Sequence, residues 1–138
     1  AFQVKRPVPE RLRLLEEAFE EAGSWVLTGS MVSWGDPLID RFDLAVFIYT
    51  PFNLRMDRLI AREEARYGAE ALEPGGAQYD AHMAFVEWAA SYDTGGPEIR
   101  SLKLHEAWIE CLPCPVVRVS GTDTTDRQIE QVAGFVKA

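Results

Sequence analysis

Four arginines at helical spacing are the strongest candidates for chemistry in this sequence. In chain order they are Arg55, Arg58, Arg62 and Arg66. Their spacing puts them in one stripe on a helix, where each pair of like charges at i and i+4 costs about 0.2–0.5 kcal/mol. An anion lying across the stripe would relieve this repulsion, and guanidinium groups suit phosphate oxygens. The alternative is a solvated face, in which acids of the same segment supply local partners.

The cysteines and histidines are weaker candidates. Cys111 and Cys114 form a C-x-x-C pair, but redox-active versions place the first cysteine at a helix N-terminus, whereas Cys111 is expected to end a helix. A zinc site would need two more ligands, and His105 is the only histidine nearby. We therefore interpret both cysteines as structural and assign no metal ligand. Acid–base roles for His82 or His105 are the less favoured alternative.

The composition is that of an acidic globular chain. Its 138 residues fit a single domain, residues 1–138, with 47% hydrophobic and 26% charged residues. The net charge of −8 argues against general nucleic-acid binding, because a phosphate backbone would be repelled. We see no apolar run of membrane-spanning length and no signal peptide, and two cysteines suit a reducing compartment. We therefore expect a cytoplasmic protein with no membrane partner.

Hydrophobic spacing predicts helices that alternate with three strands. The predicted helices span about residues 10–22, 37–41, 52–67, 79–93, 102–111 and 125–136, with Thr125 or Asp126 capping the last. The predicted strands are Trp25–Thr28, Leu44–Tyr49 and Pro115–Val119. Because Leu44–Tyr49 shows no alternation, both of its faces should be buried, as in a parallel sheet covered by helices. This order predicts an α/β fold, a three-layer sandwich with a parallel sheet.

The predicted topology also places the arginine stripe. In open α/β sheets, ligands bind beyond the carboxyl ends of the strands. The arginine helix begins directly after Leu44–Tyr49, and the Gly29-Ser30 loop, Thr50 and the Ser120-Gly121 turn should meet at the same edge. This position favours ligand binding over a purely solvated face.

These residues resemble a segment of adenylate-kinase-like P-loop kinases in which two arginines enter the lid and reach the nucleotide phosphates. The segment here is D-R-L-I-A-R at residues 57–62, after a strand that ends in Thr50-Pro51. The wider chain is similar to a bacterial group of small P-loop kinase-like ATPases. The similar stretches are residues 5–7, 23–30, 34–39, 42–44, 74–76, 88–90 and 100–102.

The resemblance implies ATP and Mg²⁺ as cofactors and a small molecule as the phosphoryl acceptor. Arg58 and Arg62 would hold the phosphates, and Arg100 would be a third arginine of a lid spanning about residues 68–100. The turn at Gly121-Thr122 would hold the adenine base. The residues that would face the acceptor are Lys5, Arg6, Ser30 and Trp34.

The chain also departs from this family. It contains no G-x-x-x-x-G-K-[ST] phosphate loop, which in the family follows the first strand, upstream of the similar region. Thr28-Gly29 replaces the Asp-Gly of nucleoside-monophosphate kinases, which disfavours a nucleotide acceptor. The family orders its strands 2-3-1-4-5. By the resemblance, the first two of these strands in chain order have no counterpart in this sequence. The absence of the central strand should leave ladder groups unpaired and an apolar edge exposed.

Three hypotheses about function follow. The first is the C-terminal part of a P-loop kinase-like protein that transfers the γ-phosphoryl group of ATP to a small molecule. The second is a non-catalytic nucleotide-binding or protein-interaction module, whose exposed edge binds a partner or a second copy as a homodimer. A phosphatase or hydrolase ranks last, because no nucleophile can be singled out.

Overall fold

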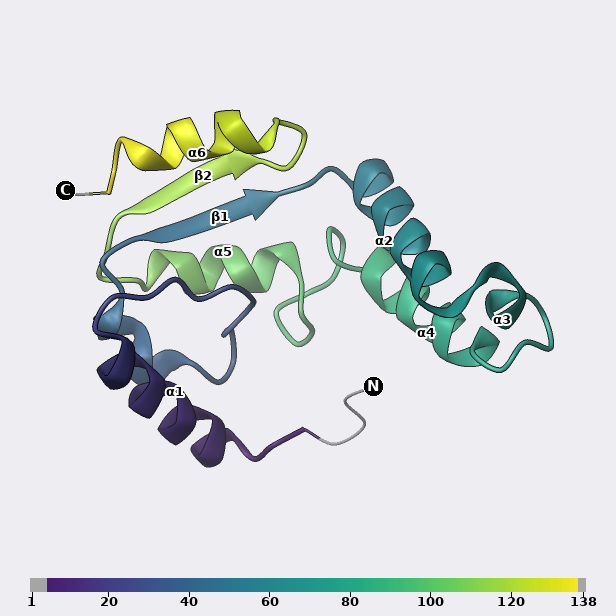
Figure 1. Ribbon diagram of the computed structural model, residues 1–138, viewed down its shortest axis with the longest axis horizontal. Coiled ribbons are helices and arrows are strands. Elements are labelled where there is room, and N and C mark those ends of the chain that lie inside the picture. The colour runs from purple at the N-terminus through teal and green to yellow at the C-terminus, as the bar shows by residue number, and fades with distance from the viewer. Residues whose placement is uncertain (1–4, 137–138) are drawn as a thin grey trace.

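A two-stranded parallel sheet stands between two groups of helices in the computed structural model, which describes residues 5–136 (Figure 1). The elements are α1 (Val8–Ala22), the 3₁₀ helix η1 (Asp36–Arg41), β1 (Ala45–Tyr49), α2 (Phe52–Tyr67), α3 (Ala69–Leu72), α4 (Tyr79–Ala90), α5 (Leu102–Glu110), β2 (Val116–Ser120) and α6 (Thr125–Ala133). Helices α2, α3 and α4 extend from the carboxyl end of β1, on the side away from α1 (Figure 1).

The two strands run parallel and in register from Ala45 beside Val116 to Tyr49 beside Ser120. Parallel strands need a long crossover, and here residues 50–115, which include four helices, supply it. The predicted α/β class and the parallel sense of the sheet are confirmed.

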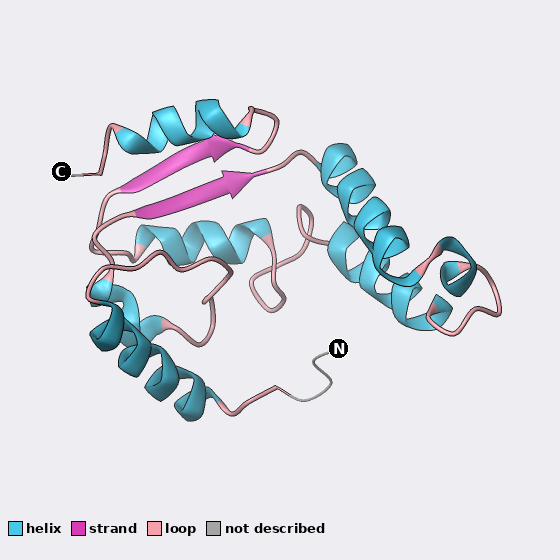
Figure 2. Cartoon of the chain, in the orientation of Figure 1, coloured by secondary structure: helices cyan, strands magenta, loops and turns pink. Residues whose placement is uncertain are grey.

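A helix lies against each face of this sheet. Alternation along the strands sends Phe47 and Arg118 to one face, where the Phe47 ring lies 6.3 Å from that of His105 on α5. Val119 points to the opposite face and lines a groove against α6, together with Val46. The result is three layers, with α5 and α6 on either side of the strands (Figure 2).

Helix boundaries follow from local chemistry. Helix α2 spans Phe52–Tyr67 and ends at Gly68, as predicted, because Gly68 adopts φ 81°. Helix α5 is capped by Ser101, whose buried hydroxyl accepts a hydrogen bond from the Leu104 N–H at 3.1 Å and donates to the Gly96 carbonyl at 2.7 Å.

The predicted cap of α6 was wrong by one or two residues. Thr124 caps this helix, not Thr125 or Asp126, and its hydroxyl accepts from the Arg127 N–H at 3.4 Å. A capping residue needs extended backbone, and Thr124 has φ −66° and ψ 155°. Thr125 and Asp126 already lie within the helix.

Two separate apolar clusters stabilise the two ends of the molecule. The first joins α1 and η1 through Phe19, Met31 and Leu38, and Trp25 stacks on Phe19 with ring centroids 3.7 Å apart. The second joins α2 and α4 and is built from Met56, Leu59 and Ala89.

The predicted strand at Trp25–Thr28 does not form. These residues have no strand assignment, and Val26 is 91% exposed. A strand needs a neighbour to pair with its N–H and carbonyl groups, and within residues 5–136 the sheet consists of β1 and β2 alone. Trp25 is held by the stacking of its ring on Phe19 and not by backbone hydrogen bonds to a neighbouring strand.

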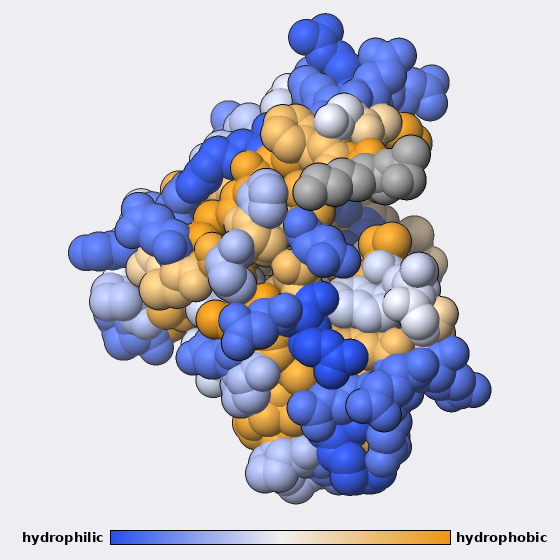
Figure 3. All heavy atoms as spheres, turned by 90° about the vertical axis from the view of Figure 1, so that its left-hand side faces the viewer, coloured by the Kyte–Doolittle hydropathy of each residue, from blue (hydrophilic) through white to orange (hydrophobic). Residues whose placement is uncertain are grey.

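The prediction that both faces of the Leu44–Tyr49 strand are buried was also wrong. Val46 and Ile48 are 41% and 55% exposed, whereas Val119 on the same face is 4% exposed. Helix α6 packs over β2 and leaves the β1 half of that face uncovered. Apolar surface reaches solvent on the side of the molecule shown in Figure 3.

Candidate functional site at the carboxyl ends of the strands

The carboxyl ends of β1 and β2 meet closely. The Gly121 N–H donates to the Tyr49 carbonyl at 2.7 Å, which continues the ladder one residue past β2. A side chain at Gly121 would collide with the hydroxyl and Cβ of Thr50. Thr50 and Gly121 thus meet at one edge, as the sequence predicted, and glycine is required there by lack of space.

Two arginines of the predicted stripe stand at this edge. Arg58 donates from Nη1 to the Gly121 carbonyl at 2.9 Å. Arg55 donates to the Thr50 carbonyl at 2.9 Å and pairs with the carboxylate of Asp93. Helix α2 starts three residues after Tyr49, so its first turns carry both guanidinium groups to the strand ends.

The remaining arginines lie farther from the strand ends along the helix or outside it. Arg62 is exposed and forms no salt bridge with the described residues. Arg66, also exposed, lies over the Tyr67 ring at 5.3 Å. Arg100 is exposed, and its guanidinium lies 5.9 Å from the Trp88 ring. The stripe therefore divides into two pairs. Arg55 and Arg58 are hydrogen-bonded at the strand ends, whereas Arg62 and Arg66 lie farther along the helix and form no salt bridge with the described residues.

A small polar network fixes Arg55. Tyr49 donates from its hydroxyl to Asp93 at 2.8 Å, and the Arg55 guanidinium also lies 5.0 Å from the Tyr92 ring. Burial acts to raise the pKa of Asp93, but hydrogen bonds from Arg55 and Tyr49 outweigh it and hold that pKa below its ordinary value. The same hydrogen bond to Asp93 raises the pKa of Tyr49. Arg55 is thus neutralised within the chain, whereas Arg58 is not.

The turn after β2 presents hydroxyls beside Arg58. The hydroxyls of Ser120 and Thr122 lie 2.7 Å apart, and the Thr122 N–H donates to Ser120 Oγ at 3.2 Å. Gln128 of α6 donates to the Ser120 carbonyl at 2.8 Å, which ties the turn to the helix. The two residues predicted to hold a base, Gly121 and Thr122, are therefore held next to one of the predicted phosphate ligands.

A serine–histidine–tyrosine chain lies nearby, and the sequence did not indicate it. Ser30 Oγ lies 2.8 Å from His105 Nε2, and the Tyr92 hydroxyl lies 2.7 Å from His105 Nδ1. Burial, and then the charge of Arg100, lowers the pKa of His105, so its ring favours the neutral form. No local motif joins these residues, because they come from separate segments of the chain. From the sequence, Ser30 and His105 were separate candidates with no connection between them, and Tyr92 was not a candidate.

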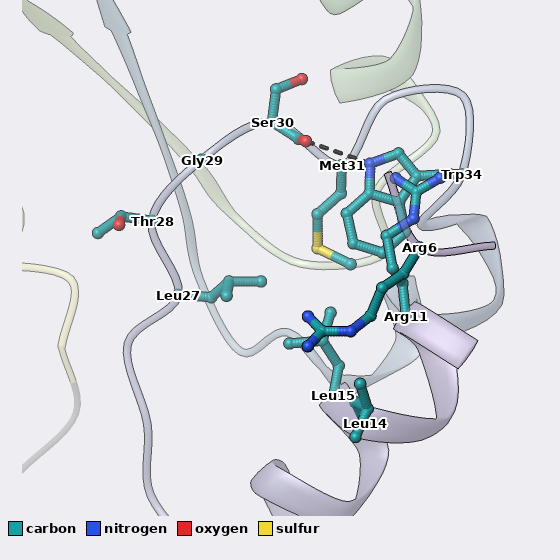
Figure 4. Close-up of a pocket in the computed structure, with 10 residues that line it drawn as sticks. All are labelled: Arg6, Arg11, Leu14, Leu15, Leu27, Thr28, Gly29, Ser30, Met31 and Trp34. Carbon is teal, nitrogen blue, oxygen red and sulfur yellow. Dashed lines mark hydrogen bonds between the residues drawn. The ribbon is translucent and has the colours of Figure 1, made fainter. Parts of the chain in front are cut away.

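The predicted acceptor residues largely gather in one pocket. Arg6, Ser30 and Trp34 line a cavity of about 280 Å³ between α1 and the loop before η1 (Figure 4). Arg11 of α1 also lines it, and sequence reasoning missed this residue. Lys5 is exposed and does not line the cavity.

The remaining sequence candidates stay apart from this edge. Cys111 is exposed at the end of α5, and burial raises the pKa of the Cys114 thiol. Within residues 5–136, no three His, Cys, Asp or Glu side chains gather closely enough to hold a metal ion. None of the helices in that range combines the length and apolar character needed to cross a membrane.

Fold and site together define an α/β protein with a parallel sheet and a cationic candidate site at the carboxyl ends of its strands. No protein-family model matches the chain, and no solved structure matches it. Over 137 residues it is 39% identical to the uncharacterised protein YqaC of Bacillus subtilis (strain 168), a match that covers 99% of this chain and 76% of YqaC. The chain belongs to the same family as YqaC.

Proposed function

We propose that this chain forms the nucleotide-binding and acceptor-binding part of a P-loop kinase-like protein that transfers a phosphoryl group from ATP to a small molecule. The observation that carries the proposal is the contact of Arg58 with the Gly121 carbonyl at the strand ends. It keeps a guanidinium group beside a turn with no room for a side chain. In this role Arg58 and Arg62 bind phosphate oxygens, and Arg100 approaches from the lid.

Charge at the edge supports an anionic ligand. Arg55 is paired with Asp93, but Arg58 and Arg62 have no carboxylate partner among the described residues, although the chain as a whole carries a net charge of −8. Two cations kept unpaired in an acidic protein favour a polyanion such as a triphosphate. The hydroxyls and amides of the Ser120–Thr122 turn can then contact the base.

The uncovered part of the sheet supports a further strand and helix in the whole protein. Among residues 5–136, β1 pairs with β2 on one edge only, and its Val46 and Ile48 side chains remain exposed. A central strand carrying a phosphate loop would pair with the free edge, and the helix after it would cover the apolar face. The match covers 76% of YqaC, so the family has room for such a segment.

The two cofactors fit the described residues to different degrees. ATP fits the unpaired Arg58 and Arg62 and the close turn at Gly121. Mg²⁺, when bound with ATP, neutralises charge on the β- and γ-phosphates. We assign it no ligand among residues 5–136, because no group of three candidate side chains gathers there. In this scheme the chain's own residues act by positioning and charge stabilisation.

Calorimetric titration of Mg²⁺·ATP into the full-length protein tests this function. Arg58→Ala and Arg62→Ala should each weaken binding by roughly tenfold, because each removes a charge-assisted contact to phosphate. Arg66→Ala is the matched control, since Arg66 lies on the same helix but over the Tyr67 ring, and should leave affinity unchanged. Absence of ATP binding, or equal losses for Arg62→Ala and Arg66→Ala, would contradict the proposal.

A specific observation also favours a second candidate, a non-catalytic interaction module. Val46, Ile48, Ile129 and Val136 leave an apolar groove open between β1 and α6. In this alternative a second copy of the chain covers the groove. A stable dimer of the full-length protein that binds no ATP would favour this module over the kinase.

A further inference from the structure

The cavity between α1 and the loop before η1 combines apolar walls with two guanidinium groups. Apolar side chains form most of its lining: Leu14, Leu15, Leu27, Met31 and Trp34. Its polar margin comes from Arg6, Arg11 and the Thr28–Ser30 loop. Figure 4 shows Arg6 reaching across the cavity and Arg11 lying against the Trp34 ring. A pocket of this kind suits a ligand with an apolar body and a negatively charged group.

We propose that this cavity binds a small aromatic anion, such as an aryl carboxylate, and that Arg11 is its main charge-recognising residue. The inference rests on the proposed function, because it names the acceptor class of the same protein. It adds Arg11 to the residues Arg6, Ser30 and Trp34. It also specifies that the ligand is negatively charged and contains an aromatic ring.

Arg11 has no anionic partner among the described residues. Its guanidinium lies 4.7 Å from the centre of the Trp34 ring, and it forms no salt bridge with the described residues. Its Nε is sealed from solvent and has no hydrogen-bond partner in that part of the chain. By contrast, Arg6 pairs with Glu10 at 3.4 Å and Arg13 pairs with Glu17 at 2.6 Å. A ligand anion in the cavity would bind the terminal nitrogens of this guanidinium group, because Nε itself is closed to solvent.

Trp34 holds the ring-binding wall in place. Its indole N–H donates to the Ser30 carbonyl at 3.3 Å, which orients the indole between the loop and α1. Arg11 covers one part of this ring and is itself held by the contact. An aromatic ligand can pack against the apolar lining while its anion meets the guanidinium group.

Size narrows the ligand class. The cavity measures about 280 Å³, just below the usual range of about 300–1,000 Å³ for small-molecule pockets. A one-ring compound fits this space better than a whole nucleotide. This agrees with the replacement of Asp-Gly by Thr28-Gly29, which already disfavoured a nucleotide acceptor.

Binding of matched one-ring probes to the full-length protein tests the proposal. Isothermal titration or ligand-observed NMR would compare benzoate with benzyl alcohol, benzylammonium and acetate. We expect benzoate to bind roughly tenfold more tightly than benzyl alcohol, because only benzoate carries a negative charge and can form an ion pair with the guanidinium group. Benzylammonium and acetate should bind more weakly still, since one has the wrong charge and the other lacks the ring.

Variants identify the residues responsible. Arg11→Met keeps the aliphatic stem and should remove the preference for benzoate, whereas Arg11→Lys should retain part of it. Arg13→Met is the matched control, because Arg13 is exposed on the same helix and outside the cavity. Trp34→Ala should weaken benzoate and benzyl alcohol alike.

The outcomes separate this inference from the kinase proposal. If benzoate does not bind, or binds no better than benzyl alcohol, the inference is overturned. The same holds if Arg13→Met matches the effect of Arg11→Met. ATP titration of the same preparations measures binding at the nucleotide site. If ATP binding is lost in Arg62→Ala but retained in Arg11→Met, the proposed function stands whether or not benzoate binds.

Discussion

Ser30 Oγ lies 2.8 Å from His105 Nε2, although 75 positions separate the two residues in the chain. The other ring nitrogen of His105 lies 2.7 Å from the Tyr92 hydroxyl. A neutral imidazole donates at one nitrogen and accepts at the other, so it can serve both neighbours at once. The ring thereby joins the loop before η1, the segment after α4 and helix α5.

Removal of one end of this chain should reduce stability. Tyr92→Phe deletes only the hydroxyl and leaves His105 Nδ1 without its partner. We expect a loss of about 0.5–1.5 kcal/mol in the free energy of unfolding, measured by urea denaturation. Tyr67→Phe is the control, because the Tyr67 hydroxyl makes no hydrogen bond to the described residues, and it should change stability by less than about 0.5 kcal/mol. Equal losses of stability in Tyr92→Phe and Tyr67→Phe would refute the structural role of the Ser30–His105–Tyr92 hydrogen bonds.

The burial of His105 predicts a pH dependence. Its folded-state pKa is lowered, so the unfolded chain binds a proton more readily and stability falls as pH drops below about 6.5, the ordinary value for histidine. The contribution is fully present above that pH. His105→Gln should lose this part of the slope when unfolding is followed between pH 7 and 5. An unchanged slope in the variant would show that another group is responsible.

Lack of space at Gly121 predicts a steric effect. Gly121→Ala would push a methyl group into Thr50 and force the strand ends apart, at a cost of about 1–3 kcal/mol. Gly134→Ala is the matched control, since an added Cβ there meets its nearest atom at 4.0 Å, and stability should hold or rise slightly. Thermal unfolding of the two variants compares them directly. A tolerated Gly121→Ala would mean that the close approach is not needed.

The pairing of Arg55 with Asp93 should stabilise the start of α2. Asp93→Asn removes a charged acceptor shared by Arg55 and Tyr49, and we expect a loss of about 1–3 kcal/mol at neutral pH. The folded pKa of Asp93 is lowered, so its contribution is present above about pH 4 and is lost as pH falls below that. The variant should therefore be less acid-sensitive than the unchanged protein. Asp57→Asn, which breaks no ion pair with the described residues, should change neither the stability at neutral pH nor the acid sensitivity.

The uncovered face of β1 predicts different outcomes at neighbouring positions. In the 138-residue chain, Ile48→Ser should cost little stability and should reduce self-association, because Ile48 is 55% exposed. Val119→Ser on the same face should cost more than about 2 kcal/mol, because Val119 is 4% exposed. Sedimentation and urea denaturation measure the two effects. If Ile48→Ser proved as destabilising as Val119→Ser, Ile48 would have to be buried in solution.

The sequence by itself determined the elements whose signals are local. Helix α2 follows from helical spacing and its stop at Gly68, and β2 from a short apolar run with many β-branched residues. The meeting of Thr50 with Gly121 followed from topology, because the carboxyl ends of parallel strands share an edge. Arg58 was found by its spacing, and its contact with Gly121 lies where that topology put it.

Tertiary structure decided everything that depends on a neighbour distant in sequence. Trp25–Thr28 has the composition of a strand but gains no ladder, because nothing in the described chain pairs with it. The burial of Val119 and the exposure of Ile48 depend on where α6 packs, which residue type does not encode. Ser30, His105 and Tyr92 meet only when three segments fold together, and Arg11 lines the cavity because α1 packs beside the loop that carries Trp34. Local patterns specify backbone conformation, whereas contacts across the fold depend on how the elements pack.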